Sequence, residues 1–162
     1  MAKLPEEGRF EYGRMDKTTG AQWVYVTPEM ARGHPKGRLG ATLWAIVAVF
    51  AAFGVLRIYA FVQTGNTILL VVALLQILTA LMLAIRAPWA VGLAGVQMVL
   101  SLLGTITGDA LRELAYLDQA EAFLTLGNLI FSGLTLFYLF EGDRPNLIYR
   151  HRFRSFRGQP ED

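Results

Sequence analysis

The chain has 162 residues, of which 54% are hydrophobic and 17% are charged, and its formal net charge is +2. This length leaves room for one domain with short tails, and so small a net charge gives no indication of nucleic-acid binding. The sequence contains no cysteine, which excludes disulfides, thiolate metal sites and thiol–disulfide chemistry.

Residues 1–40 form a polar, turn-rich N-terminal segment. The run Gln22–Thr27 alternates in a way that is typical of a strand or an extended docking segment. Trp23 and Tyr25 are candidate partner-binding residues, because a disordered tail seldom carries so many aromatic side chains. The first long apolar run begins only after this segment, so we expect no cleavable signal peptide.

Four long apolar stretches follow, and Arg57 is the one charged residue inside them. Each stretch approaches the ~20 residues that a helix needs to cross a bilayer. They cover residues 41–62, 67–85, 89–107 and 122–140. Because the first two connections are short, consecutive helices should pack antiparallel. We therefore predict an all-α integral membrane protein, with an up-down-up-down bundle of four transmembrane helices over residues 41–140 and a C-terminal tail over 141–162.

The connection between the third and fourth stretches is longer than the others. Leu111, Leu114 and Leu117 recur in it at helical spacing, with charged residues between them. This pattern predicts a short amphipathic helix on the outer membrane surface, or an extension of the third or fourth apolar helix.

The distribution of basic residues predicts the orientation. Of the fifteen lysines and arginines, thirteen lie in the two tails or in the turn that holds Arg86, whereas Arg112 alone lies in the opposite connections. Under the positive-inside rule both termini are cytoplasmic. This charge bias, together with the lack of a targeting presequence, favours the bacterial cytoplasmic (inner) membrane.

Four polar residues inside the apolar stretches form a candidate polar layer: Arg57, Gln76, Gln97 and Asn128. Arg57 could snorkel to the outer phosphates, pair with Asp109, hold an anionic headgroup or substrate, or contact another subunit. The amide side chains could make hydrogen bonds between helices, or line a pocket for a small ligand that opens to the outer side.

The C-terminal tail alternates arginine with aromatic residues. Its candidate partner- or lipid-binding residues are Tyr149, Arg150, Arg152, Phe153, Arg154 and Arg157. The tail could anchor the chain on anionic headgroups of membrane lipids, or dock on a membrane-protein partner. We expect no nucleic-acid binding.

No catalytic motif is recognisable in the chain. Its two histidines, His34 and His151, lie in the tails, so no metal, haem or other cofactor is predicted. We therefore expect no enzymatic activity.

The leading functional hypothesis is a non-enzymatic accessory or assembly subunit of a larger membrane protein complex, docking through its cytoplasmic tails and helix faces. The alternative is a small-solute or lipid transporter or binding protein that uses the polar layer around Arg57. A third hypothesis, an enzyme acting on lipids, would need Asp109 and Glu113 as its acid and base. A homo-oligomer is compatible with all three.

Overall fold

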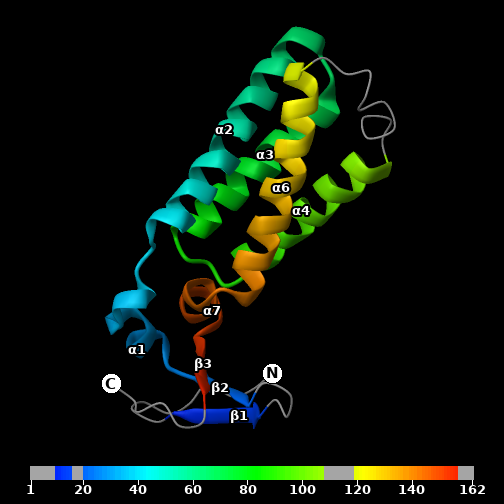
Figure 1. Cartoon of the computed structure of the whole chain (residues 1–162). Coiled ribbons are helices and arrows are strands. Elements are labelled where there is room, and N and C mark those ends of the chain that lie inside the picture. The colour runs from blue at the N-terminus through cyan, green and yellow to red at the C-terminus, as the bar shows by residue number, and fades with distance from the viewer. Residues whose placement is uncertain (1–9, 16–19, 108–118, 157–162) are drawn as a thin grey trace.

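The computed structural model describes residues 10–15, 20–107 and 119–156. This part of the chain is mostly helical and contains four helices that are long and apolar enough to cross a membrane. They are α2 (Ala41–Thr64), α3 (Thr67–Ala84), α4 (Ala90–Thr107) and α6 (Gln119–Glu141). The four predicted apolar helices are confirmed, with each end within three residues of its predicted position. They form a bundle with a small sheet at one end (Figure 1).

The connection between α2 and α3 shows how local sequence ends one helix and starts the next. Gly65 adopts a left-handed conformation (φ 68°), and its N–H donates to the carbonyl oxygen of Phe61 at 2.7 Å. The Asn66 side chain then accepts a hydrogen bond from the N–H of Ile68 at 3.0 Å and caps α3. Glycine and asparagine are the residues that suit these two positions. The two-residue connection makes α2 and α3 an antiparallel hairpin.

Helix packing is uneven across the bundle. Helix α2 packs along α3, and α4 packs along α6, whereas α3 and α4 make few contacts. A Cβ atom on Gly54 of α2 would lie 2.7 Å from Cγ1 of Ile77 on α3, and one on Gly95 of α4 would lie 2.9 Å from the Phe140 ring on α6. These two glycines therefore permit the close approach within each helix pair.

The apolar core lies in the half of the bundle next to the sheet. Leu43 and Phe50 of α2, Leu83 of α3, Val91 of α4 and Leu139 of α6 are fully buried there. Ile148 and Tyr149 of the C-terminal segment complete this core.

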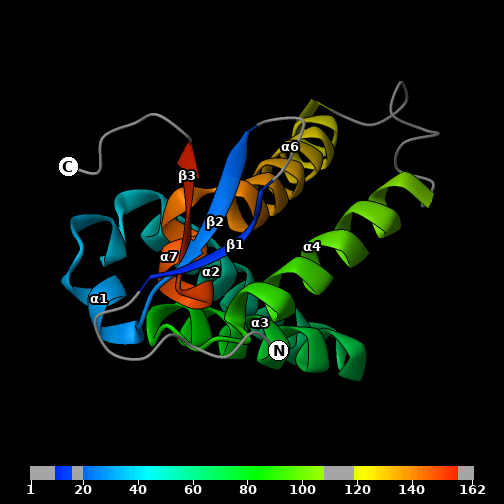
Figure 2. The same ribbon diagram turned by 90° about the horizontal axis from the view of Figure 1, so that it is seen from below.

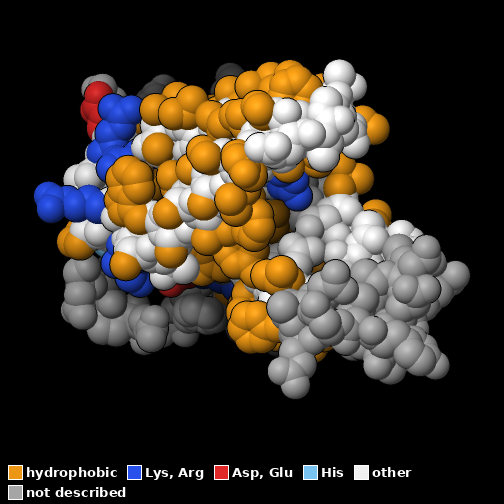
Figure 3. All heavy atoms as spheres, turned by 90° about the horizontal axis from the view of Figure 1, so that it is seen from above, with side chains coloured by type: hydrophobic (Ala, Val, Ile, Leu, Met, Phe, Trp, Pro, Cys, Tyr) orange, Lys and Arg blue, Asp and Glu red, His pale blue; other side chains and the backbone are white. Residues whose placement is uncertain are grey.

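The outward faces of the four helices are apolar as well. Figure 3 shows hydrophobic side chains over much of the described surface, with most of the basic side chains along one margin. The most exposed of these apolar residues include Val62, Ile68, Ile85, Trp89, Phe123 and Phe137. A helix packed in water would present polar residues on this side, so this surface suits hydrocarbon.

The described N- and C-terminal segments fold together at the end of the bundle, and we call residues 10–15, 20–40 and 141–156 the terminal cap. Its antiparallel sheet has the order β1 (Glu11–Met15), β2 (Ala21–Tyr25), β3 (Arg152–Phe156). Between sheet and bundle lie α1 (Pro28–Gly33) and α7 (Asp143–Arg150) (Figure 1). The 3₁₀ turn η1 (Pro35–Gly37) follows α1. Figure 2 shows the strands from below, in front of α7.

The sheet corrects the prediction of an all-α fold. Local alternation predicted a strand or an extended docking segment over Gln22–Thr27, and β2 covers Ala21–Tyr25. Its partner β3 comes from the far end of the chain, with Val24 opposite Phe153 and Trp23 opposite Arg154. Such distant pairing leaves no local signal. The predicted amphipathic helix of the outer connection lies outside the described residues.

Candidate functional site

A cavity of about 280 Å³ lies between the four long helices, and all four predicted polar-layer residues line it. Arg57 comes from α2, Gln76 from α3, Gln97 from α4 and Asn128 from α6. The remaining lining is Phe53, Val72, Leu75, Met98, Leu100, Ser101 and Phe131. At least one polar side chain from each helix therefore lines the same space in an apolar bundle.

Asn128 makes three hydrogen bonds within the protein. Its Oδ1 accepts hydrogen bonds from Ser101 Oγ at 3.1 Å and Ser132 Oγ at 3.5 Å, and its Nδ2 donates to Thr105 Oγ1 at 2.9 Å. The Thr105 hydroxyl donates to the Ser101 carbonyl oxygen at 2.9 Å, so it can only accept from Asn128. Asn128 thus joins α6 to α4 and has a structural role.

Gln97 is held in one orientation by Thr79. The Thr79 hydroxyl donates to the Leu75 carbonyl oxygen at 2.8 Å and must accept from the Gln97 amide, whose Nε2 donates to it. The amide nitrogen therefore faces α3, which leaves Oε1 of Gln97 as the free acceptor. That oxygen is buried and has no hydrogen-bond partner in the described part of the chain.

Gln76 and Arg57 also present unpartnered polar atoms. Oε1 of Gln76 and Nη1 of Arg57 are buried, and neither finds a hydrogen-bond partner among residues 10–15, 20–107 and 119–156. The Arg57 guanidinium lies 6.0 Å from the centre of the Phe53 ring. Each such buried polar group costs ~1–3 kcal/mol while it stays unsatisfied. Asp109, a predicted partner of Arg57, lies outside the described residues.

Two of the residues that line the cavity are exposed on the surface of the bundle. Gln76 and Gln97 are only 8% and 9% exposed at its inner wall. Phe53 and Leu100 also line it, yet they are 46% and 60% exposed. The lining of the cavity therefore extends from the buried amides to the apolar surface of the bundle.

The predicted tail residues lie in the terminal cap, where they contact the chain itself. Tyr149 is 2% exposed, and its hydroxyl donates to the Leu83 carbonyl oxygen at 2.8 Å. The Trp23 ring lies below two guanidinium groups, 4.2 Å from that of Arg152 and 4.7 Å from that of Arg154. This cation–π contact joins β2 to β3.

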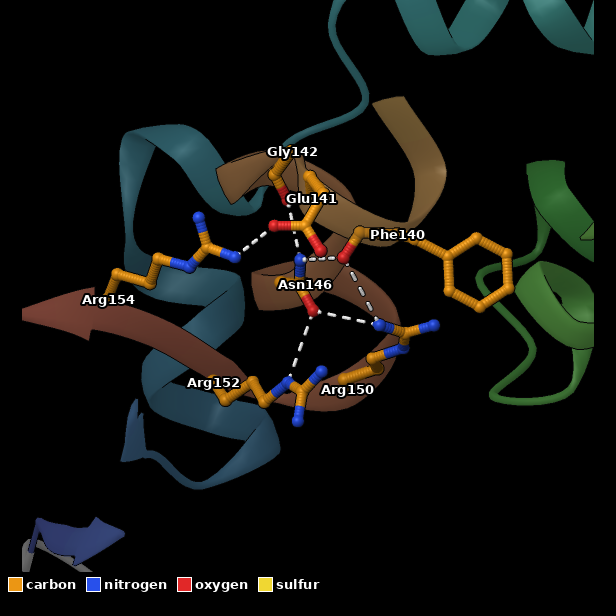
Figure 4. Close-up of polar contacts among 7 residues, drawn as sticks. All are labelled: Phe140, Glu141, Gly142, Asn146, Arg150, Arg152 and Arg154. Carbon is orange, nitrogen blue, oxygen red and sulfur yellow. Dashed lines mark hydrogen bonds and ion pairs between the residues drawn. The ribbon is translucent and has the colours of Figure 1, made fainter. Parts of the chain in front are cut away.

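Asn146 organises the arginines of the cap (Figure 4). Its Nδ2 donates to the carbonyl oxygens of Phe140 and Gly142, each at 2.9 Å. Its Oδ1 accepts from Arg150 Nη1 and Arg152 Nε, each at 3.1 Å.

Further contacts of the cap involve the remaining predicted residues. Arg154 pairs with Glu141 at the end of α6, and the Arg150 guanidinium lies 4.8 Å from the centre of the Phe140 ring. Tyr25 is half-buried on β2. Arg157 lies outside the described residues.

A second cavity of about 310 Å³ lies in the terminal cap. Phe153 lines it together with Val26, Met30 and Leu147, while Lys36, Asp143 and Arg154 are among its polar neighbours. Lys36 and Asp143 lie 3.5 Å apart as an exposed ion pair.

The residues that make hydrogen bonds to the candidate side chains were not predicted from the sequence. Ser101 and Thr105 are spaced to share one face of α4, which could have indicated a partner such as Asn128. Thr79 could be recognised as a buried hydroxyl only once α3 and α4 were placed together. Apart from its position after Pro145, nothing in the sequence indicated a role for Asn146.

Within the described ranges, no group of three or more histidine, aspartate or glutamate residues could hold a metal ion. No family model matches the chain, and comparison with characterised proteins and with solved structures finds no match either.

Proposed function

We propose that this chain is a four-span membrane protein whose helix bundle binds a small solute or a lipid without transforming it. The observation that carries the proposal is the set of three unpartnered polar atoms, on Arg57, Gln76 and Gln97, around one cavity. In hydrocarbon such groups are retained where they serve a function, because each is costly without a partner. A ligand that supplies the missing partners removes this cost.

The proposal includes an orientation. Both termini lie in the cytoplasm, most simply of a bacterial inner membrane, since the basic residues of the sequence concentrate on that side. Arg57 is seven residues from the end of α2 at Thr64, about 10 Å at 1.5 Å per residue. The cavity then lies nearer the outer face, and ligands enter from the outer leaflet.

The test is native mass spectrometry of the full chain after mild extraction from its membrane. The wild-type protein should carry a bound molecule at fixed stoichiometry, and Arg57→Leu should lose it while remaining monodisperse. Arg38→Leu is the matched control, because Arg38 is an exposed arginine that does not line the cavity. Equal retention by wild type and Arg57→Leu would contradict the proposal.

The accessory-subunit hypothesis is the second candidate, and the cavity of the terminal cap favours it. An apolar groove with a charged rim suits a segment of a partner protein. Against it, Trp23, Tyr149 and the cap arginines contact the chain itself. The same mass spectra distinguish the two candidates. A protein partner bound at fixed stoichiometry would favour the accessory role if Met30→Asp releases it and Arg57→Leu does not.

A further inference from the structure

The unpartnered atoms of the cavity define what a ligand must offer. Nη1 of Arg57 is a donor and needs an acceptor, whereas Oε1 of Gln76 and Oε1 of Gln97 are acceptors and need donors. A simple anion would satisfy Arg57 but leave both amide oxygens unpaired. A simple cation would satisfy the amides and be repelled by Arg57.

We propose that the ligand is a phospholipid with a primary ammonium in its headgroup, of the phosphatidylethanolamine type. This inference rests on the proposed function and names its ligand class. The phosphate accepts from Arg57, as guanidinium groups bind phosphate well. The ammonium, which has three N–H donors, reaches the carbonyl oxygens of Gln76 and Gln97.

The charge of the cavity suits a zwitterion. None of its lining side chains in the described part of the chain is acidic, and Arg57 is its one cationic group. The ammonium is therefore balanced by the phosphate of the same headgroup and by neutral amide oxygens. A ligand that brings both charges together is less costly to hold in an apolar bundle than an isolated ion.

The exposed apolar part of the lining suits a lipid. The lining residues Phe53 and Leu100 are also exposed on the apolar surface of the bundle, so the acyl chains can stay in hydrocarbon. The amide orientation of Gln97, set by Thr79, points its oxygen away from the α3 contact. The acceptor is therefore in place before the ligand arrives.

The test compares two lipids that differ in N–H donors. Phosphatidylethanolamine and phosphatidylcholine with identical acyl chains share the phosphate, but the choline nitrogen has no N–H. The full chain is reconstituted with an equimolar mixture, and retained lipid is counted by native mass spectrometry. We expect wild-type protein to prefer phosphatidylethanolamine by about tenfold, the factor that one hydrogen bond to a charged group supplies.

Two variants test the contacts of the ammonium and of the phosphate separately. Gln76→Leu should keep lipid binding and lower the preference for phosphatidylethanolamine, because it removes one of the two amide oxygens that accept from the ammonium. Gln76 has no hydrogen bond in the described structure that this change would break. Arg57→Leu should lose both lipids, and Arg38→Leu should behave like wild type.

Three outcomes would overturn the lipid assignment. They are equal retention of both lipids by wild type, an unchanged preference in Gln76→Leu, and displacement of the lipid by glycerophosphoethanolamine, which carries the headgroup without acyl chains. If Arg57 is still needed to retain some other molecule, the headgroup assignment fails and the proposed function stands. If Arg57→Leu changes nothing, both fail.

Discussion

At the residue scale, four polar side chains in one cavity have different roles. Asn128 is satisfied by Ser101, Thr105 and Ser132, and it joins two helices. Arg57, Gln76 and Gln97 each keep an unpartnered buried atom. The difference lies in their neighbours, because hydroxyl groups of α4 and α6 surround Asn128. Only the three unsatisfied side chains are therefore assigned to the ligand.

Tyr149 connects the terminal cap to the bundle through one buried hydrogen bond, to the Leu83 carbonyl oxygen at 2.8 Å. Tyr149→Phe should lower the free energy of unfolding by about 1 kcal/mol, which lowers the melting temperature by about 2–4 °C for a chain of this size. Thermal unfolding followed by circular dichroism in nanodiscs at pH 8 measures this shift. An unchanged melting temperature would show that the bond adds nothing.

Tyr149 should also make the free energy of unfolding depend on pH. Burial raises the pKa of Tyr149 above the ordinary tyrosine value of about 10. The unfolded state then releases this proton at a lower pH than the folded state. The stability contribution is therefore complete below pH 10 and is lost as the pH rises above it. Wild type should lose more stability between pH 9 and pH 11 than Tyr149→Phe, and parallel pH profiles would contradict this.

At the scale of the elements, close packing of α2 on α3 depends on Gly54. A side chain there would meet Cγ1 of Ile77 at 2.7 Å and the Ala73 carbonyl oxygen at 3.2 Å. Gly54→Val should therefore destabilise the bundle by about 1–3 kcal/mol. Gly92→Val on α4 is the control, since a Cβ there meets nothing within 4 Å. Thermal unfolding of both variants measures the difference, and equal losses would exclude close packing as the cause.

The elements also show what could be predicted from sequence. The four apolar helices were predictable because length and hydrophobicity are local properties. The convergence of Arg57, Gln76, Gln97 and Asn128 followed from their similar depth. The pairing of β2 with β3, and the hydroxyl groups that hold Asn128 and Gln97, depend on contacts between distant segments. No short stretch of the sequence predicts these contacts.

At the scale of the whole molecule, the terminal cap ties the two ends of the chain together. Strands β2 and β3 pair along five residues, and Arg144 donates to the Arg38 carbonyl oxygen at 3.3 Å. Whichever side of the membrane holds one terminal segment therefore holds the other. The Gly65–Asn66 connection lies at the opposite end of α2.

We propose a four-span protein with its terminal cap on the cytoplasmic side, and cysteine labelling tests this orientation most directly. The chain has no cysteine, so Glu29→Cys in α1 and Gln63→Cys near the end of α2 each provide a single thiol at an exposed position. In right-side-out vesicles, a membrane-impermeant maleimide should label Gln63→Cys at once and Glu29→Cys only after detergent is added. Labelling of both variants from the same side would contradict the placement of the terminal cap and the α2–α3 connection on opposite sides of the membrane.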